Sequence, residues 1–185
     1  MRLEKFLACT VLALSAGPAA SAVMVIGSSS ARLCYEAARS TTSAARSALE
    51  SCNRAFEEDA LSEHDTVATF VNRGILYMRR GSLDTAIADF DSAIARDPKE
   101  PEAYLNKGAA LIRVPGSARA AIPLFTAALE RNTRKPALAY FGRGIAHEEI
   151  GDVKAAYYDY KSASAADPGW QQPIAELARF TVRGN

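Results

Sequence analysis

Apolar and small residues recur through the middle of the chain with a period of about 34 residues. Within residues 67–100, Phe70, Gly74 and Tyr77 fall at i, i+4 and i+7, so they share one face of a helix. A second apolar face at helical spacing follows over residues 83–96. The pattern predicts two antiparallel helices in each copy, with small residues where the helices meet.

The small residues keep their phase from copy to copy. The first helices carry glycines separated by 34 and 36 residues, at Gly74, Gly108 and Gly144. The turns between helices carry a second series at a spacing of 35: Gly81, Gly116 and Gly151. A period that holds at several small positions indicates a repeat protein, in which each unit buries its second face against its neighbours.

Each copy resembles a tetratricopeptide repeat (TPR), whose pattern is W-x2-L-G-x2-Y, then A-x3-F, then proline. The first copy reads Phe70-x2-Arg73-Gly74-x2-Tyr77, then Ala86-x3-Phe90 and Pro98. The other two copies begin at Tyr104 and Tyr140, and the second departs from the pattern with Thr133 in the proline position. The resemblance implies an all-α fold, a right-handed superhelical solenoid of antiparallel helix pairs that ends in a C-terminal capping helix.

The predicted organisation follows from these boundaries. It comprises a cleavable signal peptide (1–22), a flexible tail (23–31), a degenerate N-terminal helical hairpin (32–66), three repeats (67–100, 101–136 and 137–170), and a capping helix with a tail (171–185). We expect Pro173 to Val182 to form the capping helix, with Trp170 and Phe180 in its core.

The N-terminus has the pattern of a secretion signal. Arg2 and Lys5 precede a largely apolar run of eleven residues over 6–16, and Ala20-Ser21-Ala22 is an A-x-A cleavage site. A membrane span needs roughly 20 apolar residues. The pattern therefore predicts export, with a bacterial periplasm as the expected compartment, and a chain that begins at Val23.

Charge excludes one class of partner. Removing residues 1–22 takes two basic residues from 22 and one acidic residue from 21, which leaves 20 of each sign. A neutral chain without a basic stripe does not have the electrostatic footprint of a nucleic-acid-binding protein.

Cys34 and Cys52 are the only cysteines after the predicted cleavage site. In an oxidising compartment an isolated pair predicts a disulfide, here across the degenerate hairpin. A redox-active pair is the alternative, but the spacing is not C-x-x-C.

The sequence carries no recognisable catalytic motif. His64 and His147 both have acidic neighbours, but adjacent helical residues point about 100° apart and do not converge on one metal ion. His147 takes the place of the repeat's tyrosine, which favours a packed residue. We therefore expect no cofactor, no metal site and no enzymatic activity.

The resemblance to TPR proteins implies a concave groove lined by the first helices. The expected groove residues are Val71, Ile75, Met78, Arg79, Leu105, Asn106, Ile112, Arg113, Phe141, Ile145 and Glu148. This mostly apolar set suits an amphipathic helix or an extended apolar peptide. The alternative is that part of the groove packs against the N-terminal tail or the capping helix of the same chain.

Co-chaperone members of the family grip a C-terminal carboxylate with Lys and Asn, then Asn, then Lys and Arg. The corresponding residues here are Val71, Ile75, Asn106, Leu138 and Gly142, of which only Asn106 fits. The carboxylate clamp is therefore predicted to be absent. Asn72 occupies the same position as Asn106 one repeat earlier, which favours packing or backbone hydrogen bonding for both asparagines.

The sequence thus predicts a non-catalytic protein–protein interaction module of the cell envelope that binds a peptide or protein segment in its groove. The partner is a protein or peptide, without nucleic acid and without a membrane span. A self-associating or complex-assembly protein that works through its edges is the alternative.

We expect protein purified from exporting cells to begin at Val23 and to be lighter than its reduced form by two hydrogen atoms. Intact-mass spectrometry before and after reduction measures both features. A mass that includes residues 1–22, or two thiols that react with iodoacetamide before reduction, would contradict the expectation.

Overall fold

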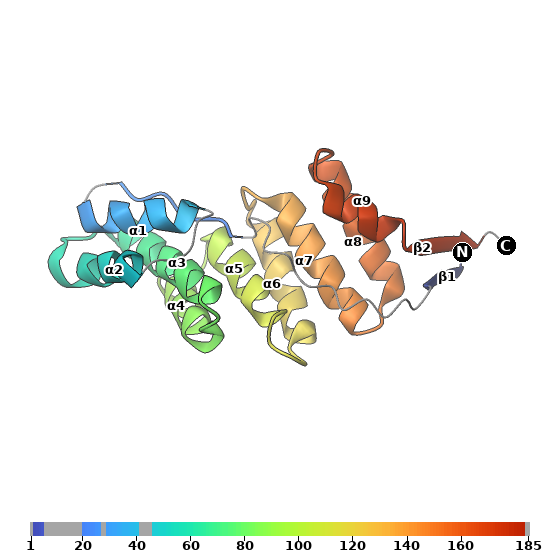
Figure 1. Cartoon of the computed structure of the whole chain (residues 1–185), viewed down its shortest axis with the longest axis horizontal. Coiled ribbons are helices and arrows are strands. Elements are labelled where there is room, and N and C mark those ends of the chain that lie inside the picture. Colours follow the sequence, from blue (N-terminus) through green and yellow to red (C-terminus); the bar gives the residue numbers. More distant parts are fainter. Residues whose placement is uncertain (1, 6–19, 27–28, 41–45, 184–185) are drawn as a thin grey trace.

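The computed structural model describes residues 2–5, 20–26, 29–40 and 46–183 of the chain (Figure 1). The apolar run of the predicted signal peptide lies outside these residues. Within them the chain forms a row of helix pairs, which starts with the N-terminal hairpin and ends near both chain termini (Figure 1).

The helices alternate as the sequence predicts. The N-terminal hairpin consists of α1 (Ser29–Arg39) and α2 (Arg46–Glu58). The repeats follow as α3 (Glu63–Arg79) with α4 (Leu83–Arg96), α5 (Pro101–Leu111) with α6 (Ala118–Glu130), and α7 (Pro136–Glu149) with α8 (Val153–Ala166). The last helix is α9 (Gln171–Leu177).

The interior glycines mark the places where two helices of a repeat meet most closely. A Cβ atom on Gly74 would lie 2.5 Å from the ring of Phe90, and one on Gly144 would lie 2.8 Å from the ring of Tyr160. Phe90 and Tyr160 are buried. Each aromatic ring therefore occupies the space that a side chain in the first helix would need.

The second glycine series has a different cause. Gly81, Gly116 and Gly151 end the turns between paired helices with φ of 80°, 79° and 82°. Residues with a Cβ rarely adopt this left-handed conformation. The two series in the sequence thus report two separate constraints, close helix packing and tight reversal of the chain.

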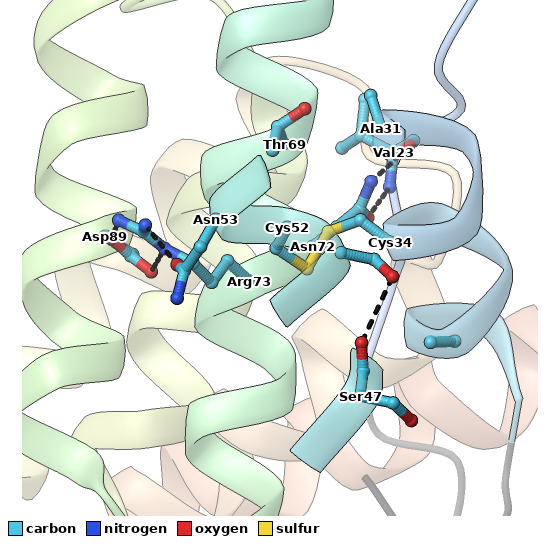
Figure 2. The surroundings of a disulfide bond; sticks show 12 residues. Val23, Ala31, Cys34, Ser47, Cys52, Asn53, Thr69, Asn72, Arg73 and Asp89 are labelled. Atoms are coloured by element: carbon cyan, nitrogen blue, oxygen red, sulfur yellow. Dashed lines mark hydrogen bonds and ion pairs between the residues drawn. A yellow bond between two sulfur atoms is a disulfide. The ribbon is translucent and has the colours of Figure 1, made fainter. Parts of the chain in front are cut away.

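In the first and third repeats, a bidentate ion pair joins the two helices of the repeat. Arg73 in α3 donates to both carboxylate oxygens of Asp89 in α4, at 2.9 and 2.7 Å, and also to Asn53 in α2 (Figure 2). Arg143 and Asp159 form the same pair between α7 and α8. The second repeat has Lys107 in the equivalent position, and it pairs with Asp91 of the preceding repeat.

The N-terminal hairpin holds both cysteines at its centre. Cys34 in α1 and Cys52 in α2 are fully buried, and their sulfur atoms lie 2.08 Å apart (Figure 2). They pack with Leu49 of α2 and Leu76 of α3. The geometry agrees with the predicted pairing of these two cysteines. The same cluster packs the hairpin against α3 of the first repeat.

The C-terminal segment differs from the predicted single helix over Pro173 to Val182. The helix ends at Leu177, and Phe180–Arg183 forms a strand, β2, antiparallel to β1 (Arg2–Lys5). Phe180 is still buried, because its ring packs against Tyr157 and Tyr160 of α8. The capping contact expected of Phe180 is present, but a strand rather than a helix delivers it.

The predicted flexible tail over residues 23–31 is also wrong for the residues that the structure describes. Residues 20–26 form an extended segment, hereafter the N-terminal segment, and α1 already begins at Ser29. Val23 and Val25 are buried in the main apolar core. Residues 22–26 are uniformly apolar in the sequence, so no period of two distinguishes a bound extended segment from an unstructured tail.

Replacing Gly74 with alanine should lower the free energy of unfolding by about 1–3 kcal/mol, because the new methyl group must displace the buried ring of Phe90. Denaturant unfolding measures this change. Gly169→Ala is the matched control, since its Cβ would have only an ordinary contact at 3.6 Å, and it should change stability by less than about 0.5 kcal/mol. Equal stability of Gly74→Ala and the parent would contradict the proposed packing constraint.

Candidate functional site

The predicted groove face of the first repeat is covered by residues 20–26 and by α1 of the same chain. Val71 and Ile75 of α3 are completely buried. They share one apolar cluster with Val23 and Val25 of the N-terminal segment and with Ala31 and Ala38 of α1. These two predicted groove residues are therefore covered by other parts of the same chain.

Asn72 holds the N-terminal segment by its backbone. The Val23 N–H donates to Asn72 Oδ1 at 2.9 Å, and Asn72 Nδ2 donates to the Val23 carbonyl oxygen at 2.8 Å (Figure 2). One amide side chain therefore satisfies both main-chain groups of one extended residue. All of these atoms are buried, where an unpaired polar group would cost about 1–3 kcal/mol.

Asn106 repeats this arrangement one repeat later. The Ser21 N–H donates to Asn106 Oδ1 at 3.2 Å, and Asn106 Nδ2 donates to the Ser21 carbonyl oxygen at 3.1 Å. The same Nδ2 also donates to the Glu102 carbonyl oxygen at 2.8 Å within α5, which fixes the orientation of the amide. Asn72 and Asn106 thus bind alternate residues of one extended segment, and we call them the asparagine pair.

A buried carboxylate supports the segment beside Asn106. Glu102 is fully buried and accepts hydrogen bonds from the Thr133 hydroxyl at 3.0 Å and the Arg134 backbone N–H at 2.9 Å. The Arg134 guanidinium pairs with the same carboxylate at 3.2 Å and donates to the Ala22 carbonyl oxygen at 3.4 Å. Arg134 therefore contacts the segment on the carbonyl that lies between the two asparagine-bound residues.

Asp65 anchors the other end of the segment. Its carboxylate accepts the Ile26 N–H at 2.8 Å. Burial alone would raise the pKa of Asp65, but hydrogen bonds from Ile26, Ser62 and His64 outweigh it and lower the pKa below its usual value. Together with the Arg134 contact on Ala22, the segment is thus held at four backbone positions, by two neutral amides, one guanidinium and one carboxylate.

Arg79 and Met78 have structural roles at the edge of the groove. The Arg79 guanidinium donates to the carbonyl oxygens of Ala37, Ala38 and Ser40, at the C-terminal end of α1, over 2.6–3.2 Å. Burial lowers the pKa of Arg79. Arg113 donates to the Met78 carbonyl oxygen at 2.8 Å. These two predicted groove cations therefore bind backbone carbonyls of the chain itself.

The remaining predicted groove residues lie along the second and third repeats. Leu105 is buried, whereas Ile112, Phe141 and Ile145 are half-buried. Phe141 packs against Tyr160 and Trp170, with ring centroids 5.4 and 4.7 Å apart.

Glu148, the last of the predicted groove residues, contacts α8 and the residues that follow α9. It accepts a hydrogen bond from the Tyr160 hydroxyl at 2.8 Å and pairs with Arg179 at 3.0 Å.

The positions of the family's carboxylate clamp hold no cation. Val71 and Ile75 are core residues, and Asn106 binds the main chain of Ser21. A Cβ on Gly142 would lie 2.4 Å from the ring of Phe125 in α6, so α7 has no room for a longer side chain there. The predicted use of the asparagines in backbone hydrogen bonding agrees with these contacts.

Sequence reasoning did not identify Asp65 or Arg134 as parts of the site, and it gave packing of the N-terminal tail in the groove only as the alternative. Residues 20–26 carry no alternation of polar and apolar residues in the sequence, and the alternation of buried Ser21, Val23 and Val25 with more exposed neighbours is seen only in the structure. Asp65 looked like an ordinary acidic residue in the first turn of a helix. The contact of Arg134 with Ala22 joins residues 112 positions apart, which periodicity does not reveal.

No catalytic constellation is visible in the described part of the chain. There, no group of three histidine, cysteine or acidic side chains is arranged to hold a metal ion. His147 is largely buried, with its ring nitrogens 3.8 Å from Asp152 and 3.9 Å from Asp159. Among the described helices, none combines the length and the hydropathy of a membrane span.

Two family models match the repeats. One, a TPR repeat, matches residues 74–113, and the other, a tetratricopeptide repeat, matches residues 116–169. Together they cover just over half of the chain. The chain therefore contains tetratricopeptide repeats, which generally mediate protein–protein interactions.

Solved structures of TPR domains have the same fold. The first TPR of Spaghetti (RPAP3), bound to the HSP90 peptide SRMEEVD, is 24% identical, with a TM-score of 0.58 over 61% of this chain and 88% of that one. The first TPR domain of human RPAP3 is also 24% identical, with a TM-score of 0.59 over 63% and 90% of the two chains. At this identity the likeness establishes the all-α helical-repeat fold alone.

A comparison with curated proteins found no significant match.

Asp65 should make the stability of the protein depend on pH in the acidic range. Because its folded pKa is lowered, its hydrogen bonds stabilise the fold fully above the pKa of the unfolded chain, about 4, and are lost as the pH falls through the folded pKa. We expect the parent to exceed Asp65→Asn in unfolding free energy at pH 7 and this difference to shrink at pH 3. Denaturant unfolding at both pH values measures it, and a difference independent of pH would contradict the role of the carboxylate.

Proposed function

We propose that this protein is a non-catalytic interaction module that binds a segment of a protein partner in its concave groove. The observation that carries the proposal is the N-terminal segment itself. A stretch of polypeptide lies across α3 and α5, with its backbone bound by the asparagine pair and two of its side chains in the core. This bound segment supports a groove that accepts a polypeptide.

Class and composition support the same proposal. TPR domains generally bind other proteins, and the solved TPR of Spaghetti holds a peptide of HSP90. The half-buried residues Ile112, Phe141 and Ile145 continue the apolar face beyond the asparagine pair. An apolar face next to a backbone-binding amide is suited to a peptide ligand.

We further propose that the protein acts in the cell envelope after export. The charged, apolar and A-x-A regions within residues 1–22 support export, and the buried Cys34–Cys52 pair is suited to an oxidising compartment. Cleavage after Ala22 would leave Val23 to Ile26 attached to the folded chain.

Photo-crosslinking in cells tests the proposed function. We expect probes at Ala109 and Ile112, both half-buried on the groove side, to capture one discrete protein. Probes at Asp91 and Lys161, which are exposed in α4 and α8, are the controls and should capture nothing. Mass spectrometry of the crosslinked peptides then shows which segment of the partner lies in the groove.

Two outcomes would contradict the groove as a partner site. Capture of the same protein at equal yield from Asp91 and Lys161 would place the interaction on another surface. Crosslinks only between copies of the chain would favour the self-assembling protein that the sequence left as the alternative.

A further inference from the structure

The way in which the N-terminal segment is bound defines a chemical preference of the groove. Each member of the asparagine pair contacts an N–H and a C=O of the same residue, at Val23 and at Ser21. These groups are identical in every residue except proline, so the asparagine pair binds backbone and not a particular side chain. It requires two residues that are spaced as in an extended chain.

An α-helical ligand cannot satisfy this requirement. In a helix, the N–H and C=O groups along its length are already paired with each other four residues apart. An extended segment leaves both groups of alternate residues free on one side. The asparagine pair therefore decides between the two ligand types that suit an apolar groove, in favour of the extended peptide.

Side-chain selection comes from the alternation of burial. Ser21, Val23 and Val25 are 5%, 3% and 8% exposed, whereas Met24 and Ile26 are 53% and 71% exposed. The positions that face the groove hold a small residue next to Asn106 and β-branched residues next to α3. A ligand would need small or β-branched side chains at alternate positions and could vary at the others.

The predicted cleavage site falls between the two asparagine contacts. Cleavage after Ala22 would keep Val23 on Asn72 and would remove Ser21 from Asn106. The backbone-binding groups of Asn106 and the Arg134 guanidinium would then face the groove without their present partners in the segment. Processing would thus open the second repeat to another extended chain.

We propose that the N-terminal segment competes with an extended partner peptide for the asparagine pair, and that the peptide which displaces it carries small or β-branched residues at alternate positions. The proposal deepens the proposed function and rests on it. A ligand that must first displace the segment binds with an apparent affinity reduced by the fraction of empty sites.

The test uses the uncleaved chain, made without export so that Ser21 is retained, and a fluorescent synthetic peptide with the sequence of residues 20–26, Ala-Ser-Ala-Val-Met-Val-Ile. The variant Ser21→Pro/Val23→Pro lacks both N–H donors to the asparagine pair and leaves the groove unchanged. We expect this variant to bind the peptide at least tenfold more tightly than the parent does, measured by fluorescence anisotropy. The single variant Ser21→Pro replaces it if circular dichroism shows that the double variant does not fold.

Backbone methylation separates main-chain binding from apolar adhesion. Methylation of the peptide nitrogen at the first valine, the counterpart of Val23, should weaken binding to the variant at least tenfold. Methylation at the methionine should leave binding unchanged, because its counterpart Met24 alternates with the asparagine-bound residues and is exposed. Adding Asn72→Ala to the variant should reproduce the loss with the unmodified peptide.

The outcomes distinguish this proposal from the proposed function. Equal binding of the two methylated peptides would overturn main-chain binding, yet it would leave a groove that accepts polypeptide. Equal affinity of parent and variant would overturn competition by the N-terminal segment. Absence of binding to every form would contradict both proposals, and dimerisation of the variant at rising concentration would assign the site to a second copy of the chain.

Discussion

An extended chain that crosses a helical surface must find partners for its own N–H and C=O groups, because the helices beneath it have already paired theirs. In this protein two asparagine side chains supply those partners, Asn72 to Val23 and Asn106 to Ser21. Their hydrogen bonds allow Val23 and Val25 to enter the core of the first repeat without leaving buried polar groups unpaired. The covered groove and the position of α1 both depend on this arrangement.

The asparagine pair is effective because the repeats place it with the required spacing. Asn72 and Asn106 occupy equivalent positions in α3 and α5, and the packing of Phe90 on Gly74 and of Phe125 on Gly108 sets how these helices lie. The third repeat has Gly142 in the equivalent position, against the ring of Phe125, so the series ends after two asparagines. The close packing that stabilises the solenoid therefore also limits the length of the backbone-binding site.

Much of the fold was predictable from the sequence, because each helix pair has its own periodic signal. The second helix of the first repeat begins and ends where the pattern of apolar residues predicts, at Leu83–Arg96. The pairing of Cys34 with Cys52 was predicted from the number of cysteines together with the expected oxidising compartment. Local spacing carries this information, and local spacing is what a repeat conserves between its own copies.

The contacts of the site were harder to predict, since they join residues far apart in the sequence. Val23 lies 49 residues from Asn72, and Ser21 lies 85 residues from Asn106. Residues 20–26 also carry the signature of a signal-peptide cleavage site, which directs attention away from any structural role. The end of the chain was misjudged for a related reason, because Phe180 has helical spacing from Leu177 but lies in a strand that pairs with residues 2–5.

The central claim is that the asparagine pair holds residues 20–26 in the groove through their backbone. Hydrogen exchange of the Ser21 and Val23 amides, followed by NMR in the full-length parent and in Asn72→Ala, tests it most directly. The account predicts that both amides exchange more slowly than in an unstructured peptide, and that Asn72→Ala releases the Val23 amide while α3 remains protected. Exchange of both amides at the unstructured rate in the parent would contradict it.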